Sequence, residues 1–224
     1  AGIANTDNYI VDFPQEDDPS TPDDESGYLA DYYGISIMDP TALAWHTSDF
    51  SPTDGDNWWC GDEDVGGYLD SWVQYLDTPA FTVTPSGATL TADMKWAIED
   101  PAGATIAGTC TDGWDQANVQ VSTDGGDTWM VLEGSDPYDF QCGYGTIYNG
   151  FDGAPGWGGM ADWHNVSFDL NAYASQEISI RFAFYSDPAY STIDASDITG
   201  FQVDNIVVSS LLGDLISDTG DDSE

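Results

Sequence analysis

An excess of carboxylates over cations constrains this chain more than any other feature of its 224 residues. It contains 34 Asp and seven Glu but only two basic side chains, Lys95 and Arg181, and its formal net charge is −39. Asp disfavours helix interiors and favours turns and caps, because its short carboxylate competes for nearby backbone groups. Together with 24 Gly and 11 Pro, this bias predicts strands joined by turns, with little helix.

The same imbalance excludes several classes of partner. Two cations cannot neutralise a phosphate backbone, so we expect no nucleic-acid partner and no attachment to anionic lipid through a basic patch. No run of 18 apolar residues occurs, which predicts no transmembrane segment. The composition is not that of a disordered acidic chain, since 41% of the residues are hydrophobic and 13% are aromatic, which is enough to bury a core.

The first residue and the cysteines predict an exported protein. The chain begins at Ala1 with no apolar signal stretch before it, as expected for the mature form of a secreted, extracellular or cell-surface protein. Cys60, Cys110 and Cys142 fit an oxidising compartment, with one disulfide and a third cysteine that is either unpaired or bonded to another molecule.

Residues 1–27 differ in composition from the rest of the chain. Asn8–Phe13 is strand-like, and Pro14–Gly27 holds three prolines and six acids, the composition of an extended, self-repelling tether. The apolar residues of the strand are Tyr9, Ile10, Val11 and Phe13. We therefore divide the chain into an N-terminal strand and tether (1–27), a β-sandwich (28–212) and an acidic C-terminal tail (213–224).

The body alternates apolar and polar residues with the period of a strand. One face of Ala88–Glu99 is apolar, and Asp124-Gly125-Gly126 separates two strand-like runs, as in a hairpin. Short strands with Gly-rich turns predict an all-β fold, an antiparallel jelly-roll β-sandwich with an extended N-terminal strand arm. The predicted strands are Gly34–Met38, Asn57–Cys60, Trp72–Val83 with a break at Pro79, Ala88–Glu99, Gln116–Thr123, Thr128–Glu133, His164–Leu170, Glu177–Tyr185 and Phe201–Ser209.

Strand direction predicts where the long connections lie. If each consecutive strand reverses direction, four long connections fall at one end of the sandwich, and long loops gathered at one end usually carry function. These connections are Gly61–Ser71, Asp100–Asp115, Gly134–Trp163 and Ser186–Gly200. All three cysteines lie at this end, so any pair is geometrically plausible, and we favour a disulfide between Cys110 and Cys142.

Carboxylates at the long-loop end predict a Ca²⁺ site, because Ca²⁺ prefers several hard oxygen ligands on loops. Most of the candidates end one strand or begin the next. The candidate ligands are Glu99, Asp100, Asp112, Asp115, Asp187 and Asp204. Each of them taken singly also fits a solvated or turn-capping residue. The charge excess over the rest of the surface fits either adaptation to high salt or Ca²⁺ bridging between subunits.

A series of motifs resembles a known module. The motifs are Ala44-Trp45-His46, Trp58-Trp59-Cys60-Gly61-Asp62, Gly66-Gly67-Tyr68, Leu76-Asp77-Thr78-Pro79, residues 114–119, residues 121–129, residues 168–174, Arg181-Phe182, Ser186-Asp187 and residues 201–206. In this order they resemble the MAM-like jelly-roll module of secreted immune-inhibitor-A-type metalloproteases and related bacterial surface proteins.

The resemblance implies a two-sheet sandwich with bound Ca²⁺, and it points to Glu99, Asp115 and Asp187 as ligands, with Asp204 on the last strand. It does not imply protease activity. The two histidines, His46 and His164, are far apart in the sequence and form no His-Glu-x-x-His zinc motif. We therefore expect that the chain is not an enzyme. A hydrolase using paired carboxylates is a weaker alternative, because any pair among 41 acids carries little information.

The N-terminal strand suggests a structural function. An apolar strand on an acidic tether can pair with its own domain, or it can complete the sheet of a neighbouring subunit by β-augmentation, which builds a filament when repeated head to tail. We predict a Ca²⁺-stabilised, self-assembling subunit of an extracellular filament or surface layer. Its partners are copies of itself, contacted through Tyr9, Ile10, Val11 and Phe13.

The alternative function is a carbohydrate- or matrix-binding (adhesin) module. Flat aromatic rings beside carboxylates can stack on sugars, and the rings proposed for this role are Trp114, Trp157 and Trp163. The same rings also suit the packing of Gly-rich loops, which need large side chains as anchors.

Overall fold

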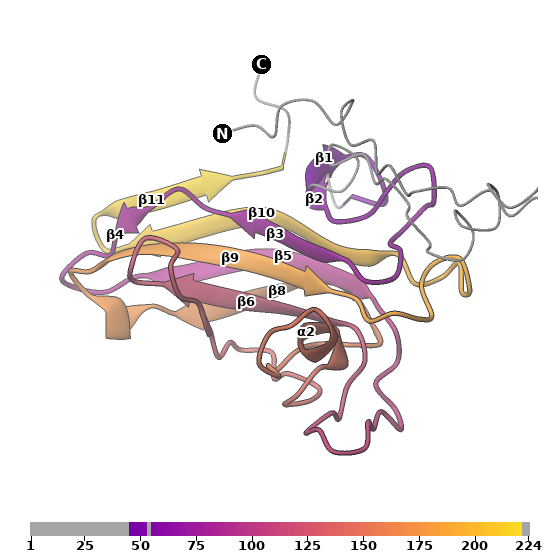
Figure 1. Cartoon of the computed structure of the whole chain (residues 1–224). Helices are drawn as coiled ribbons and strands as arrows, with labels where there is room; N and C mark the ends of the chain where they lie inside the picture. The colour runs from indigo at the N-terminus through magenta and orange to yellow at the C-terminus, as the bar shows by residue number, and fades with distance from the viewer. Residues whose placement is uncertain (1–44, 53–54, 221–224) are drawn as a thin grey trace, which may run out of the picture. The chain divides into compact units, whose positions relative to one another are not determined.

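The computed structural model describes residues 45–52 and 55–220, and within these ranges the chain is almost entirely β (Figure 1). The exceptions are the short helix α2 (Tyr144–Tyr148) and the 3₁₀ turn η2 (Asn171–Tyr173). The strands are β1 (His46–Ser48), β2 (Asn57–Trp59), β3 (Val73–Asp77), β4 (Phe81–Thr82), β5 (Thr89–Ala97), β6 (Gln116–Ser122), β7 (Met130–Val131), β8 (Met160–Asp169), β9 (Glu177–Tyr185), β10 (Gly200–Ser210) and β11 (Gly213–Asp218).

The strands form two antiparallel sheets. In the first sheet the order is β1-β2-β10-β5-β8, with β11 also paired to β10, and in the second it is β3-β9-β6-β7, with β4 also paired to β9. Every pairing between these strands is antiparallel. The predicted all-β antiparallel sandwich is therefore confirmed. The N-terminal strand and tether (1–27) and the predicted strand Gly34–Met38 lie outside the described residues.

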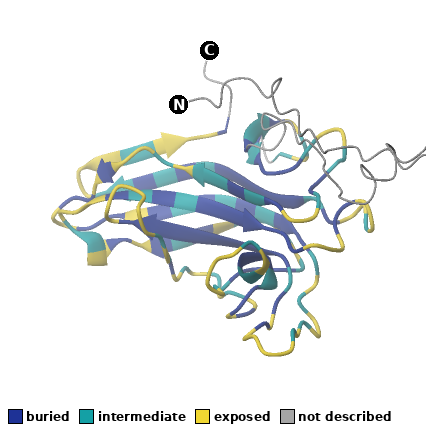
Figure 2. Ribbon diagram, viewed as in Figure 1, coloured by how far each residue is buried: buried dark blue, intermediate teal, exposed yellow. Residues whose placement is uncertain are grey.

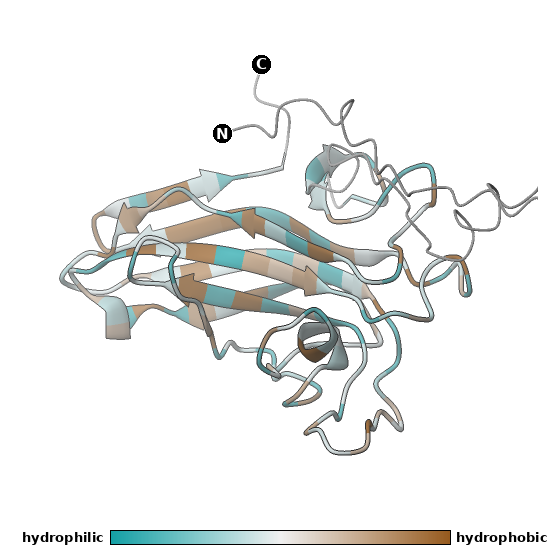
Figure 3. Ribbon diagram, viewed as in Figure 1, coloured by the Kyte–Doolittle hydropathy of each residue, from teal (hydrophilic) through white to brown (hydrophobic). Residues whose placement is uncertain are grey.

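The core lies between the two sheets and follows the alternation of the strands. On β5, Leu90, Ala92 and Met94 are completely buried, and on β9 Phe182 and Phe184 are buried opposite them. Buried and partly exposed positions alternate along β5 and the first half of β9, whereas β6 is buried throughout (Figure 2). Hydrophobic and hydrophilic residues also alternate along β9 (Figure 3). Burial of apolar surface, at roughly 25 cal/mol per Å², is thus the main force that stacks the sheets.

The strand β11 corrects the predicted domain boundary. Residues 213–218 pair with β10, from Ser210↔Gly213 to Ile206↔Asp218, so the assignment of a tail from residue 213 onwards is wrong for this segment. Leu215 and Ile216 pack against the core, and this burial outweighs the flanking charge of Asp214 and Asp218. β1 and α2 were also not predicted, because both are too short to show a periodic pattern.

The long loops meet at one end of the sandwich, the right-hand end in Figure 1, as strand direction predicted. The Ser71 N–H donates to the Asp187 backbone carbonyl at 2.6 Å, and Gly113 forms a β-bridge with Gly143. The opposite end carries the short turns. Among residues 45–52 and 55–220, no helix has the length and apolarity that a membrane span requires.

The predicted disulfide between Cys110 and Cys142 is confirmed, with a Cα–Cα distance of 5.8 Å. It joins the connection that precedes β6 to the loop that carries α2. The Asp112 carboxylate strengthens this junction, because its Oδ1 accepts the Cys142 N–H at 2.7 Å. Cys60 is a free, buried thiol, and burial raises its pKa to about 12.

Replacing both disulfide cysteines with serine should lower the free energy of unfolding by about 3–4 kcal/mol, because the bond closes a loop of 32 residues in the unfolded chain. Urea denaturation measures this difference.

In the same samples, Cys60 should resist iodoacetamide at pH 8 while the protein is folded and should react once it unfolds. Rapid labelling of the native protein would contradict the buried position of this thiol.

Candidate metal centre

Three carboxylates converge at the long-loop end. Glu99, Asp115 and Asp187 each offer one oxygen, and these oxygens lie within 4.8 Å of one another. Glu99 follows the end of β5 in the first sheet, whereas Asp115 directly precedes β6 and Asp187 follows β9 in the second sheet. The cluster therefore spans the two sheets where their strands end.

The pairing of β6 with β9 brings two of the three carboxylates together. Gln116 lies opposite Tyr185 in this register, so the residues just beyond them, Asp115 and Asp187, meet outside the sheet. The Asp187 N–H donates to Asp115 Oδ1 at 2.6 Å, and Asp187 Oδ1 accepts the Ala189 N–H at 2.9 Å. Backbone donors thus fix the orientation of both side chains.

Tyr68 is the residue of this site that was not predicted from the sequence as a functional group. Its hydroxyl donates to Asp115 Oδ2 at 2.7 Å and accepts the Glu99 N–H at 3.2 Å. The ring is completely buried and packs edge-on against Phe184. Tyr68 therefore orients the Asp115 carboxylate and holds the backbone of Glu99 beside it, as groups around metal ligands commonly do. The motif Gly66-Gly67-Tyr68 was the feature of the sequence that could have pointed to Tyr68 as part of this site.

The cluster concentrates negative charge in a buried place. Asp115 is 0% exposed and Asp187 is 5% exposed. The two basic side chains of the chain are engaged elsewhere, because Lys95 Nζ donates to Ser51 Oγ at 2.7 Å and Arg181 pairs with Asp77.

The pKa values of the cluster reflect this burial. Burial, and then repulsion by Asp187, raise the pKa of Glu99 to about 8. Burial also raises the pKa of Asp115 well above its ordinary value, although the hydrogen bonds from the Asp187 N–H and Tyr68 oppose the shift. The pKa of Asp187 is raised by burial and by Asp70. Three acids with raised pKa values need either protons or a cation.

The other three predicted ligands do not join the cluster. Asp100 Oδ1 accepts the Ala102 N–H at 2.9 Å, which closes a local turn. The Asp112 carboxylate faces the disulfide loop, where it accepts the Gln141 and Cys142 N–H groups. Asp204 is buried within β10, opposite Asp93. We therefore keep Glu99, Asp115 and Asp187 as the candidate ligands.

The aromatic residues proposed for sugar stacking have different environments. The prediction is wrong for Trp157, because its side chain is completely buried and stacks on Trp96 at 5.1 Å between ring centroids, so it anchors the loop to the core. Trp114 is half-buried and lies edge-on to Tyr144. Trp163 is half-buried, and its indole N–H donates to the Ser51 carbonyl at 2.8 Å.

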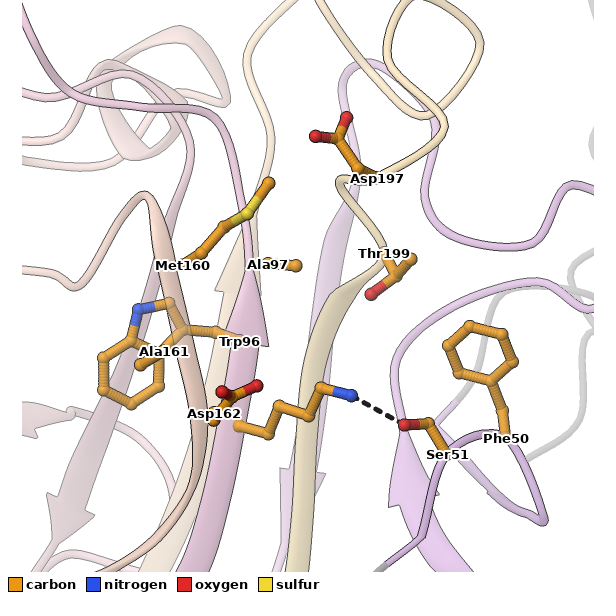
Figure 4. A pocket seen from close by; sticks show the side chains of 10 residues that line it. Phe50, Ser51, Trp96, Ala97, Met160, Ala161, Asp162, Asp197 and Thr199 are labelled. Carbon is orange, nitrogen blue, oxygen red and sulfur yellow. Dashed lines mark hydrogen bonds between the residues drawn. The ribbon is translucent and has the colours of Figure 1, made fainter.

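Lys95 lies in a hollow of about 410 Å³ beside the first sheet. Figure 4 shows Trp96, Met160 and Asp197 around this hollow, with the Lys95 amine directed to Ser51. None of its acids belongs to the group of three carboxylates found within the described part of the chain. The candidate metal centre therefore comprises Glu99, Asp115 and Asp187 and does not extend to this hollow.

No protein-family model matches this chain, and no curated protein matches it. Its function must therefore be argued from the chemistry of its own residues.

Without divalent ions, the protein should become less stable as the pH rises from 5 to 8. Because the pKa of Glu99 is about 8 in the folded state and 4.5 ordinarily, the folded state binds more protons than the unfolded chain between these values. The raised pKa of Asp115 acts in the same direction. Thermal melting in a chelator at constant ionic strength measures the effect.

Added Ca²⁺ should raise the Tm more at pH 8 than at pH 5, because protons compete with the ion.

Glu99→Gln is the matched control for this titration. It removes one raised pKa at a half-buried position, so the dependence of the Tm on pH should become weaker. An equal Tm at both pH values in chelator, or a Ca²⁺ effect that does not change with pH, would argue against a coupled carboxylate cluster.

Proposed function

We propose that this chain is a Ca²⁺-stabilised structural protein of the cell exterior, in which an ion held by Glu99, Asp115 and Asp187 joins the two sheets. The observation that carries the proposal is the meeting of three carboxylates within 4.8 Å at a place where two of them are buried. A divalent cation would replace the protons that these groups otherwise require.

The donor set favours Ca²⁺ over other biological metals. All three side chains offer oxygen, whereas Zn²⁺ sites are usually built with His or Cys. Mg²⁺ requires near-ideal octahedral geometry, but Ca²⁺ accepts six to eight oxygens in an irregular arrangement that includes backbone carbonyls and water. The irregular loops beside Asp115 and Asp187 suit such a ligand shell.

The surroundings of the cluster favour a structural role for the ion. Tyr68 joins Asp115 to Glu99 through its hydroxyl, and the Ser71 N–H bonds to the backbone of Asp187. An ion here would tie together the loops that end β5, precede β6 and follow β9. The nearby Cys110–Cys142 disulfide supports an oxidising, extracellular compartment.

Assembly through the N-terminal strand is the second part of the proposal. Tyr9, Ile10, Val11 and Phe13 lie outside the described residues, so this part is supported by their sequence and by the sheets they would join. Within the described part of the chain, β3 is an edge strand of the second sheet, because only β9 pairs with it. Such an edge is a template for an added strand.

Calorimetric titration with Ca²⁺ tests the ion site. Glu99→Gln should weaken binding by about 10-fold to 100-fold through loss of a ligand, and Tyr68→Phe should weaken it by about 10-fold through loss of the hydrogen bond that positions Asp115. Asp100→Asn is the matched control, since it changes a neighbouring exposed acid outside the cluster. The ion site would be refuted if the wild type bound no Ca²⁺, or if Asp100→Asn weakened binding as much as Glu99→Gln.

Deleting residues 1–13 tests the donor strand. With Ca²⁺, the full chain should elute as a polymer in size-exclusion chromatography with light scattering, and the deletion should yield monomers whose Ca²⁺ affinity is unchanged. Deleting residues 1–7 spares the apolar strand and should leave the polymer intact. Normal polymerisation without residues 1–13 would exclude the strand as the subunit contact while leaving the ion site untouched.

A further inference from the structure

A hollow of about 620 Å³ lies on the second sheet, and its lining comes from five separate parts of the chain. Tyr75 belongs to β3, Arg181 and Tyr185 belong to β9, and Gln120 belongs to β6. Trp129 precedes β7, and Phe151 stands in the loop after α2. The volume falls in the range of small-molecule sites, roughly 300–1,000 Å³.

Polar side chains of the central strands are held in fixed positions beside this hollow. Gln120 Nε2 donates to Asn118 Oδ1 at 2.8 Å and to the Tyr185 hydroxyl at 3.2 Å. Asn118 Nδ2 in turn donates to the Pro155 carbonyl at 2.8 Å, so the loop after α2 is tied to the sheet. Gln120 is only 6% exposed. A ligand would therefore meet groups that are already ordered, which lowers the entropic cost of binding.

Arg181 holds two aromatic rings in place beside these polar groups. Its guanidinium lies 3.7 Å from the centroid of the Tyr75 ring and 3.9 Å from that of Trp129. Its Nε and Nη2 atoms each donate to the Asp77 carboxylate at 2.7 Å. The single arginine of the chain thus fixes two rings through cation–π contacts, while Asp77 balances its charge.

The rim combines apolar and acidic groups. Phe151 is 48% exposed and Met130 is 53% exposed, so both offer apolar surface to a ligand in the hollow. Asp127 and Asp152 also line the hollow and are exposed. Their carboxylates accept hydrogen bonds but repel anions, as does the formal net charge of −39.

We propose that this hollow binds a neutral oligosaccharide. The C–H faces of a sugar ring would lie against Trp129 and Phe151, and its hydroxyls would bond to the polar groups of the central strands and to the rim carboxylates. A purely apolar ligand would displace water from the rim carboxylates of Asp127 and Asp152 without offering them a donor, at a cost in affinity. An added peptide strand would need a free strand edge, whereas this floor is the face of a sheet. The proposal does not depend on the ion site.

Titration of intrinsic tryptophan fluorescence with neutral hexasaccharides of glucose, mannose, galactose and N-acetylglucosamine tests the proposal, with Ca²⁺ present throughout. At least one of the four should bind to the wild type. Trp129→Ala and Phe151→Ala should each weaken that binding by about tenfold or more, and affinity electrophoresis in a gel containing the sugar checks the result independently of Trp129 emission.

Trp58→Ala is the matched control. Like Trp129, Trp58 is half-buried and its indole N–H is hydrogen-bonded within the protein, but it stands on β2 of the other sheet. The affinity of this variant should stay within about twofold of the wild type, and unchanged circular dichroism should confirm that all variants are folded. No binding at about 10 mM of any hexasaccharide, or equal losses in Trp58→Ala and Trp129→Ala, would overturn the proposal.

Discussion

Burial of negative charge at the ends of three strands is the constraint on which the long-loop end depends. Asp115 is the centre of this arrangement, because one of its oxygens accepts the Tyr68 hydroxyl and the other accepts the Asp187 N–H. These donors orient the carboxylate but do not neutralise it. The pKa values of Glu99, Asp115 and Asp187 are all raised, so the folded state favours whatever supplies positive charge at this point.

The scarcity of cations gives each basic side chain a local structural role. Arg181 lies opposite Asp77 on β3 and Gln120 on β6, and this cross-strand row places the guanidinium between two rings. Lys95 donates to Ser51 Oγ beside the other sheet. Because neither reaches the carboxylate cluster, the proposed ion and the proposed sugar site have separate physical origins. The first arises from unbalanced charge and the second from a balanced ion pair between aromatic rings.

Alternation made the sandwich predictable, and strand direction predicted that acids gather at its long-loop end. The choice of Glu99, Asp115 and Asp187 among these acids came from the resemblance to a known module. The bounds of β9 agree with the prediction, Glu177–Tyr185, because its residues alternate between polar and apolar up to Phe182 and stay apolar to the end of the strand. Burial of single rings was not predictable in this way. Trp157 stands in a Gly-rich loop with no period, and its burial against Trp96 depends on the hydrogen bonds between its backbone and Ala117. The contact between the Arg181 guanidinium and the Trp129 ring likewise depends on the register of β6 with β7 and with β9, which is far away in the sequence.

Dissolved salt and a specifically bound ion act on different carboxylates of this protein: salt screens the exposed ones, and a bound ion would neutralise the buried cluster. Mobile ions shorten the Debye length to about 3 Å at 1 M and screen exposed carboxylates effectively, so high salt alone can relieve repulsion across most of this surface. Buried charges are screened much less, and Asp115, which is 0% exposed, is closed to the ion atmosphere. Adaptation to salt therefore cannot substitute for a ligand at the cluster. If the protein does work in high salt, the carboxylates of Glu99, Asp115 and Asp187 would still require a specifically bound cation or protons.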